Sequence, residues 1–157
     1  MDLEQAKQIE AGCVIYVYSL CLEHKIAPDH GFEHALHVAS LARLGLSDFE
    51  DISLLQALLV LLASLLHDID DYKIFKTKNY ANATKFLDAT TLADEHKHIV
   101  LKMISLVSYS KNKNTIPDDL PKWMLIPRDA DRLTGGGRTG IERTLAFNEN
   151  NAEYGRC

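Results

Sequence analysis

The sequence predicts an all-α protein. Apolar residues recur at three- and four-residue spacings in several segments, and one long segment is apolar almost throughout. No window alternates between apolar and polar residues as a half-buried strand would. A chain of 157 residues with 46% hydrophobic residues can fill one core, so we expect a single domain spanning residues 1–157.

The N-terminal part predicts two amphipathic helices. Residues from about 3 to 26 place apolar side chains on one face and charges on the other. A proline then interrupts the pattern, and we expect Asp29 to cap a second helix. The apolar stripe of that helix carries His34 together with Val38 and Leu41, so His34 is predicted to face the core.

The third predicted helix, at about residues 52 to 68, contains the run LLQALLVLLASLL. A helix that is apolar almost all round is enclosed by other helices, so we expect it to be the central one. The run is well short of the ~20 apolar residues that a bilayer span needs, so we expect no membrane partner. The helix ends on His67 and Asp68.

The rest of the chain shows weaker helical signals. We expect further helical segments at Tyr80–Leu87, His98–Val107, 121–133 and 141–148. Asp94 is the expected cap of the segment that carries His98. The glycine-rich TGGGRTG sequence separates the last two segments, because consecutive glycines interrupt a helix.

The composition excludes several classes of protein. A formal charge of -5 argues against a nucleic-acid scaffold partner, which would need clustered lysines and arginines. The three cysteines, Cys13, Cys21 and Cys157, form no CxxC pair, so neither a disulfide framework nor a thiolate zinc site is indicated. The N-terminus has no secretory pattern. We therefore expect a cytoplasmic protein; its oligomeric state stays open, a homodimer included.

The chemistry is centred on His67 and Asp68, which end the most apolar helix. At a helix C-terminus both side chains can turn toward one ion, and the negative end of the helix dipole favours a cation. An isolated His-Asp pair is more often a helix cap and a solvated carboxylate. The neighbouring motifs therefore decide between the two interpretations.

Three motifs accompany this doublet: HGFEHALHVASLA upstream, HDIDDYK around it, and DADRL followed by GIERTLAF downstream. In this order, and on predicted helices, they resemble the HD-domain phosphohydrolase superfamily, most closely its small stand-alone bacterial-type members. The resemblance covers roughly residues 28 to 148. It implies a helical bundle around a buried central helix. It also implies one divalent ion, with the ligands His34, His67, Asp68 and Asp131.

The choice among neighbouring residues follows from the same resemblance. His34 is favoured over His37 because it shares the apolar stripe and has the family's His-x-x-x-Val spacing, although a lone histidine there is usually a packed core residue. His30 lies four residues earlier, and we expect it to touch substrate or water in the same cavity. Asp131 is favoured over Asp129 because the family aspartate precedes Arg-Leu.

Two imidazoles and two carboxylates suit Mn, Fe, Co, Ni, Zn or Mg with positions left for water, whereas structural zinc prefers a closed site. Such an ion lowers the pKa of bound water from 15.7 toward about 7. Asp71 lies three residues beyond Asp68, on the same side if the helix continues, and is expected to orient or deprotonate that water. The alternative is that Asp71 is a solvated member of an acidic run.

Phosphate chemistry also requires fixed positive charge, and the candidates are Lys73, Arg132 and Arg143. Lys73 and Arg143 fall in segments that resemble family motifs, although each alone is more often a surface charge. Arg138 and the glycines at 135–137 offer a weaker signal for anion binding, in a link more glycine-rich than the family's.

The leading hypothesis is hydrolysis of a small phosphate ester, a nucleotide or related metabolite, by metal-activated water. His96 and His98 are candidates for a second metal site, but positions two apart face different sides of a helix, so we expect one metal. A di-iron oxygenase of HD-like fold would need such extra ligands. A non-catalytic nucleotide sensor is the other alternative.

Overall fold

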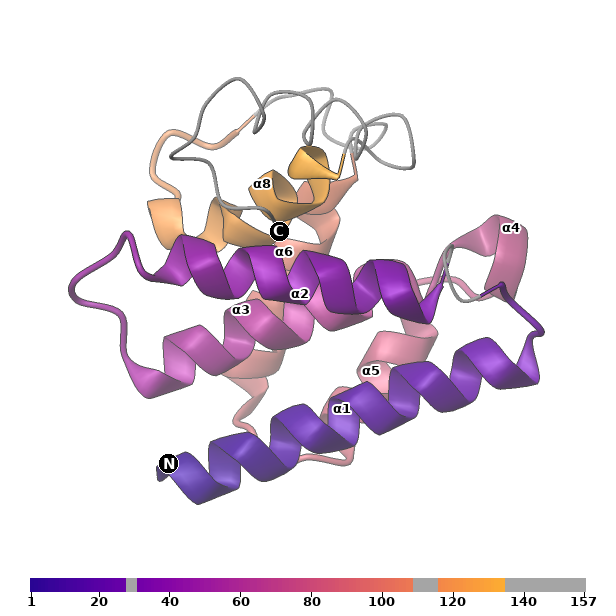
Figure 1. The fold of residues 1–157 in the computed structure, drawn as a ribbon. Coiled ribbons are helices and arrows are strands. Elements are labelled where there is room, and N and C mark those ends of the chain that lie inside the picture. Colours follow the sequence, from indigo (N-terminus) through magenta and orange to yellow (C-terminus); the bar gives the residue numbers. More distant parts are fainter. Residues whose placement is uncertain (28–30, 109–115, 135–157) are drawn as a thin grey trace.

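The computed structural model describes residues 1–27, 31–108 and 116–134 (Figure 1). These residues form helices and their connections, and no strand occurs among them, which confirms the predicted all-α class. The elements are α1 (Leu3–Glu23), α2 (Phe32–Leu46), α3 (Leu54–Leu66), α4 (Tyr72–Phe75), α5 (Ala81–Asp88), α6 (Asp94–Val107), the 3-10 helix η2 (Lys122–Leu125) and α8 (Ile126–Leu133).

Helix α3 is the centre of the fold, as the sequence predicts. It packs against α1, α2, α6 and α8, and Figure 1 shows it between α1 and α2. Every residue from Leu58 to Leu66 is buried. This continuous burial matches the nearly uniform apolar composition, because each face of the helix meets another helix. Within the described part of the chain, no helix is long and apolar enough to cross a bilayer.

The ends of α3 are set by side-chain bonds and determine where His67 lies. Ser53 accepts a hydrogen bond from the backbone of Gln56, whose side chain accepts one in return from the backbone of Ser53. This capping box starts the helix at Leu54 rather than at residue 52. His67 is the C-cap, so Asp68 lies beyond the helix and not inside it as the sequence predicts. His67 still has helical backbone angles, whereas Asp68 lies outside the helical repeat.

The first two helices also differ from the prediction at their ends. Helix α1 stops at Glu23 instead of 26, and Lys25 then adopts a left-handed conformation with φ of 55°. Helix α2 begins with Gly31 as its N-cap, so the predicted capping by Asp29, which lies outside the described residues, is wrong. A Cβ atom at Gly31 would lie 2.8 Å from Cγ2 of Ile26, so the close approach of this turn requires glycine.

The later helices form near the predicted segments, with shifted ends. Helix α6 starts at Asp94, which is its first residue instead of its cap. Helix α5 starts and ends one residue later than predicted. The predicted segment 121–133 divides into η2 and α8, with a proline in the first turn of α8, where its missing N–H costs nothing. The short α4 is absent from the prediction. The predicted helix at 141–148 lies outside the described residues.

Candidate metal centre

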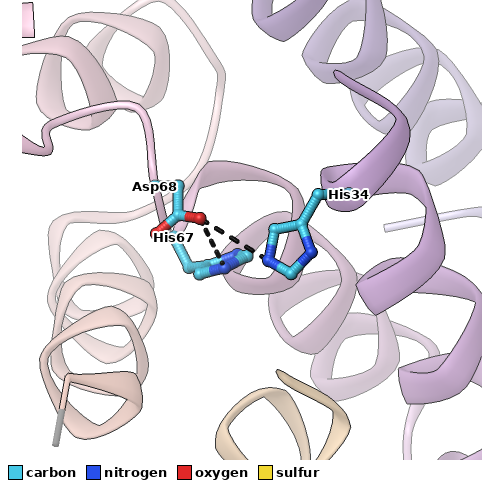
Figure 2. Close-up of side chains that lie close together, drawn as sticks. All are labelled: His34, His67 and Asp68. Carbon is cyan, nitrogen blue, oxygen red and sulfur yellow. Dashed lines mark ion pairs between the residues drawn. The ribbon is translucent and has the colours of Figure 1, made fainter. Parts of the chain in front are cut away.

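Four side chains that are distant in sequence meet at the C-terminal end of α3. His34 comes from the first turn of α2, His67 and Asp68 from the end of α3, and Asp131 from α8. Figure 2 shows His34, His67 and Asp68 converging on one point. The Nε2 atom of His34 lies 3.1 Å from Asp131 Oδ1 and 3.6 Å from Asp68 Oδ2. The Nε2 atom of His67 lies 3.2 Å from Asp68 Oδ2 and 3.4 Å from Asp131 Oδ1.

Packing among the helices brings these residues together. Helices α2 and α8 pack against α3 and against each other. His34 shares its stripe with the buried Val38 and Leu41, and its side chain is 13% exposed, in agreement with the prediction that it faces the core. Asp131 is 19% exposed. Asp129, by contrast, points to the surface and pairs with Arg128 at 2.9 Å, so only Asp131 faces the histidines.

His67 has a buried ring nitrogen that lacks a hydrogen-bond partner among the described residues. Its side chain is 2% exposed, and its Nδ1–H donates to the carbonyl oxygen of Ser64 at 2.7 Å. Because Nδ1 carries this hydrogen, Nε2 of the neutral imidazole holds a lone pair. Nε2 is buried without a hydrogen-bond partner although it faces Asp68 and Asp131. A buried lone pair beside two carboxylates is unfavourable unless a proton or another cation lies between them.

The electrostatics of the cluster favour positive charge. Burial alone would lower the pKa of His67, but the carboxylates of Asp68 and Asp131 outweigh it and raise that pKa well above 6.5. Burial would likewise raise the pKa of Asp131, but the hydrogen bond from His34 and the positive charges of the two imidazoles hold that pKa below its usual value. The pKa of Asp68 is also lowered, because the charge of the adjacent His67 outweighs the partial desolvation of the carboxylate. Both carboxylates are therefore ionised and attract a cation.

A divalent metal ion fits this donor set. His34, His67 and Asp68 offer ligand atoms that all lie within 4.8 Å of one another. Asp131 is not part of that set, but its Oδ1 lies 3.1 Å from His34 Nε2 and 3.4 Å from His67 Nε2 and adds a second carboxylate on the side of the histidines. Metal bonds of about 2.0–2.2 Å place neighbouring ligand atoms roughly 3.0–3.6 Å apart, which is the range of the four nitrogen–oxygen contacts. The bond from His67 to Ser64 is also the kind that orients a metal-binding imidazole.

An open cleft of about 1000 Å³ lies beside the cluster. Its wall includes His67, Asp68 and Asp131, much of the connection from α3 to α5, and the end of α6. Asp68 is 58% exposed, whereas the other three side chains of the cluster are mostly buried. The cluster is therefore accessible to a small molecule from the side of Asp68.

Asp71 and Lys73 both line this cleft. Asp71 lies there because it begins the short helix α4, which the sequence does not predict. The helix does not continue from Asp68 to Asp71, so the predicted shared helical face is wrong. Asp71 is instead the N-cap of α4, and its Oδ1 accepts a hydrogen bond from the backbone N–H of Lys73 at 2.9 Å. This bond places both residues at the cleft wall.

The other predicted substrate contacts are not brought to the cleft by the described residues. Arg132 is exposed on α8 and is not among the cleft residues. His30, Arg138, Arg143 and the glycines at 135–137 lie outside the described residues.

A second metal site is not found in the described ranges. His98 is exposed, and the Nε2 atom of His96 lies 3.7 Å from a carboxylate oxygen of its neighbour Glu95. The group of His34, His67 and Asp68 is the one set of possible metal ligands in the part of the chain that the structure describes. The described residues therefore add no ligand for a second ion.

Asp70 is a structural residue of the cleft that the sequence reading missed. Its Oδ1 accepts hydrogen bonds from the Thr77 hydroxyl (2.6 Å) and the Asn82 backbone (2.8 Å), and its Oδ2 accepts one from the Ala83 backbone (2.9 Å). The Asn82 side chain donates to the carbonyl oxygen of Ile69. These bonds hold the connection between α3 and α5 in place. The only signal for this role in the sequence is an aspartate that precedes a segment with weak helical periodicity.

Comparisons with known proteins identify a relative but no family. The chain is 38% identical over 137 residues to an uncharacterized protein of Acanthamoeba polyphaga mimivirus, in an alignment that covers 79% of this chain and 55% of the viral protein. It thus spans about half the length of that relative. No family model matches the sequence, and no solved structure does. The function must therefore be argued from the site itself.

Proposed function

We propose that this protein is a metal-dependent phosphohydrolase of the HD-domain type that acts on a small phosphate ester, a nucleotide or related metabolite. The observation that carries the proposal is the buried Nε2 of His67, which faces two carboxylates without a hydrogen-bond partner. This atom lies at the wall of a cleft large enough for a small metabolite. A site whose donors suit a metal ion and that is open to solvent fits catalysis better than a purely structural role.

His34, His67, Asp68 and Asp131 would hold one divalent ion, and the nitrogen and oxygen donors suit Mn, Fe, Co, Ni, Zn or Mg. When bound, such an ion activates water as a nucleophile and screens the charge of a phosphate. His34 and His67 anchor the centre from its buried side, whereas Asp68 faces the cleft. Substrate is therefore expected to approach past Asp68.

The cleft supplies positive charge for a phosphate group. Lys73, on α4, and Lys78, on the connection to α5, both line it. Ammonium groups at the wall of a cleft bind phosphate oxygens through charge-assisted hydrogen bonds. Because Asp68, Asp70 and Asp71 line the same cleft, a phosphate should bind on the side of the lysines.

Asp71 is the proposed general base. Its Oδ1 is occupied by the backbone N–H of Lys73, but a carboxylate has a second oxygen that can accept a proton from water. The bond to Lys73 also fixes the carboxylate at the cleft wall, as a residue that positions water requires. The proposed base and the proposed phosphate-binding Lys73 are therefore held together at the start of α4.

The direct test is a screen for phosphate release across nucleotides and sugar phosphates with each of these metals. We expect metal-dependent turnover of at least one ester, its loss in His67→Ala, and its retention in His98→Ala, which removes an exposed histidine away from the cluster. A protein that binds metal and nucleotide but releases phosphate from no ester would contradict the proposal. That result would favour the nucleotide sensor.

A further inference from the structure

A second, apolar cavity lies next to the proposed metal centre. It has a volume of about 320 Å³ and is lined by residues of α1, α2, α3 and α4, by the turn that follows α3, and by Ile26 and Gly31 between α1 and α2. Asp68 and Asp71 are the only charged residues in its described wall, and both also line the larger cleft. The two aspartates therefore form a common wall between a polar cleft and an apolar cavity.

The cavity is built from rigid, buried side chains but is open at one side. Val17, Leu65 and Ile69 in its wall are almost fully buried within the core. Ile74, by contrast, is 41% exposed and also lines the cavity. Protein interiors are usually packed without voids of this size, so an apolar cavity with an exposed apolar rim suits a ligand better than it suits core packing.

We propose that this apolar cavity binds the aromatic or aliphatic group of the phosphate ester whose phosphate lies in the cleft. The inference rests on the proposed function and names the substrate class more closely. An apolar cavity of roughly 150 Å³ is enough to bind benzene, so 320 Å³ accommodates a group of one or two rings.

Charge decides which end of the substrate enters which space. A phosphate in the apolar cavity would meet the carboxylates of Asp68 and Asp71 without a lysine in the described wall. The cleft wall contains the same two carboxylates and those of Asp70 and Asp131, but there the phosphate also meets Lys73 and Lys78. A substrate that spans the common wall therefore places its phosphate in the cleft and its apolar group in the cavity.

The test compares phenyl phosphate with its two halves, phenol and inorganic phosphate, by calorimetry and ligand-observed NMR on the metal-loaded protein. Full burial of an apolar group corresponds to about a 10- to 100-fold gain in affinity, so phenyl phosphate should bind about 10- to 100-fold more tightly than inorganic phosphate. Two variants change the cavity. Ala35→Leu fills it from α2, and Ile74→Ser makes its exposed rim polar.

Both variants should lose most of the advantage of phenyl phosphate while binding inorganic phosphate like the wild type. Ser40→Leu, at an exposed position of α2, is the matched control for added volume and should change neither affinity. Metal content measured in each variant shows whether the centre is intact, and Ile74→Ser provides the test if Ala35→Leu fails to fold. Equal affinity for phenyl phosphate in wild type and Ile74→Ser would overturn the assignment.

Binding and turnover separate this inference from the proposed function. If phosphate esters are hydrolysed but the phenyl group adds no affinity that the two variants remove, the apolar subsite is wrong and the phosphohydrolase stands. If the phenyl group adds affinity that the variants remove but no ester is hydrolysed, the subsite stands and the catalytic proposal fails.

Discussion

The imidazole of His67 donates a hydrogen bond from Nδ1 to the carbonyl oxygen of Ser64, 2.7 Å away and one turn earlier on α3. The Ser64 hydroxyl in turn donates to the carbonyl oxygen of Val60 at 2.8 Å. The last turns of α3 therefore fix the orientation of the ring and leave Nε2 facing Asp68 and Asp131. The same helix that forms the centre of the core thus also positions the proposed metal ligand.

Asp71→Asn should keep the metal stoichiometry and lower kcat by roughly 10² to 10⁴, the usual contribution of a general base. Asparagine caps a helix about as well as aspartate, so α4 should remain in place and the change isolates the charge. Asp68→Ala should lose both metal and turnover. Metal content and kcat measured on the same preparations check this, and a kcat near wild type in Asp71→Asn would leave Asp71 as a cap alone.

Metal binding should release about one proton per chain near neutral pH. The raised pKa of His67 means that its proton stabilises the metal-free protein fully below pH 6.5, and that this stabilisation is lost as pH rises through the raised pKa. A metal ion must displace that proton, so the apparent affinity should rise with pH up to this pKa. Calorimetry in buffers of different ionisation heat measures the release; identical heats in all buffers would argue against His67 as a ligand.

Lys73→Gln should raise KM for the phosphate ester by about 10-fold or more, because a hydrogen bond to a charged group contributes about 1.5–3 kcal/mol. Lys97→Gln is the matched control, since Lys97 lies on α6 and pairs with Asp88 and Asp94 at the surface. Steady-state kinetics on the ester found in the screen compares the two variants. An equal KM in both would remove Lys73 from the substrate site.

Asp70→Ala should lower the free energy of unfolding by about 1–3 kcal/mol, because it leaves three donors without their acceptor: the Thr77 hydroxyl and two backbone N–H groups in the first turn of α5. Asp88→Ala removes an exposed carboxylate and should change it by less than about 0.5 kcal/mol. Urea denaturation measures both. Metal content should be retained in Asp70→Ala, since the hydrogen bonds of Asp70 go to Thr77 and α5 and not to the four proposed ligands; a loss of metal would place Asp70 in the centre.

The sequence predicts the parts of the site that depend on helical periodicity. His34 lies on a stripe of buried residues, and His67 follows a run that is apolar on every face, so both positions follow from local pattern. The choice of Asp131 over Asp129 agrees with the structure, but it came from a family resemblance, since periodicity alone does not distinguish them.

The connection between α3 and α5 could not be predicted in this way. A place for Asp71 on the same side as Asp68 depends on a helix that continues past Asp68, whereas α3 ends at Leu66 and α4 is only four residues long, too short to show a period. The role of Asp70 depends on backbone donors 12 and 13 residues away, which no local pattern reveals. The cavity next to Asp68 likewise exists only once α1, α2 and α4 are packed together.

The most direct test of the proposed centre is the metal content of the purified protein. We expect elemental analysis after metal loading to give about one divalent ion per chain, because the described residues offer one set of ligands. His67→Ala should lose that ion and keep the helical circular dichroism of the wild type, whereas His98→Ala should keep both. A wild-type chain that binds no divalent ion, or a His67→Ala variant that still binds one with wild-type affinity, would contradict the account.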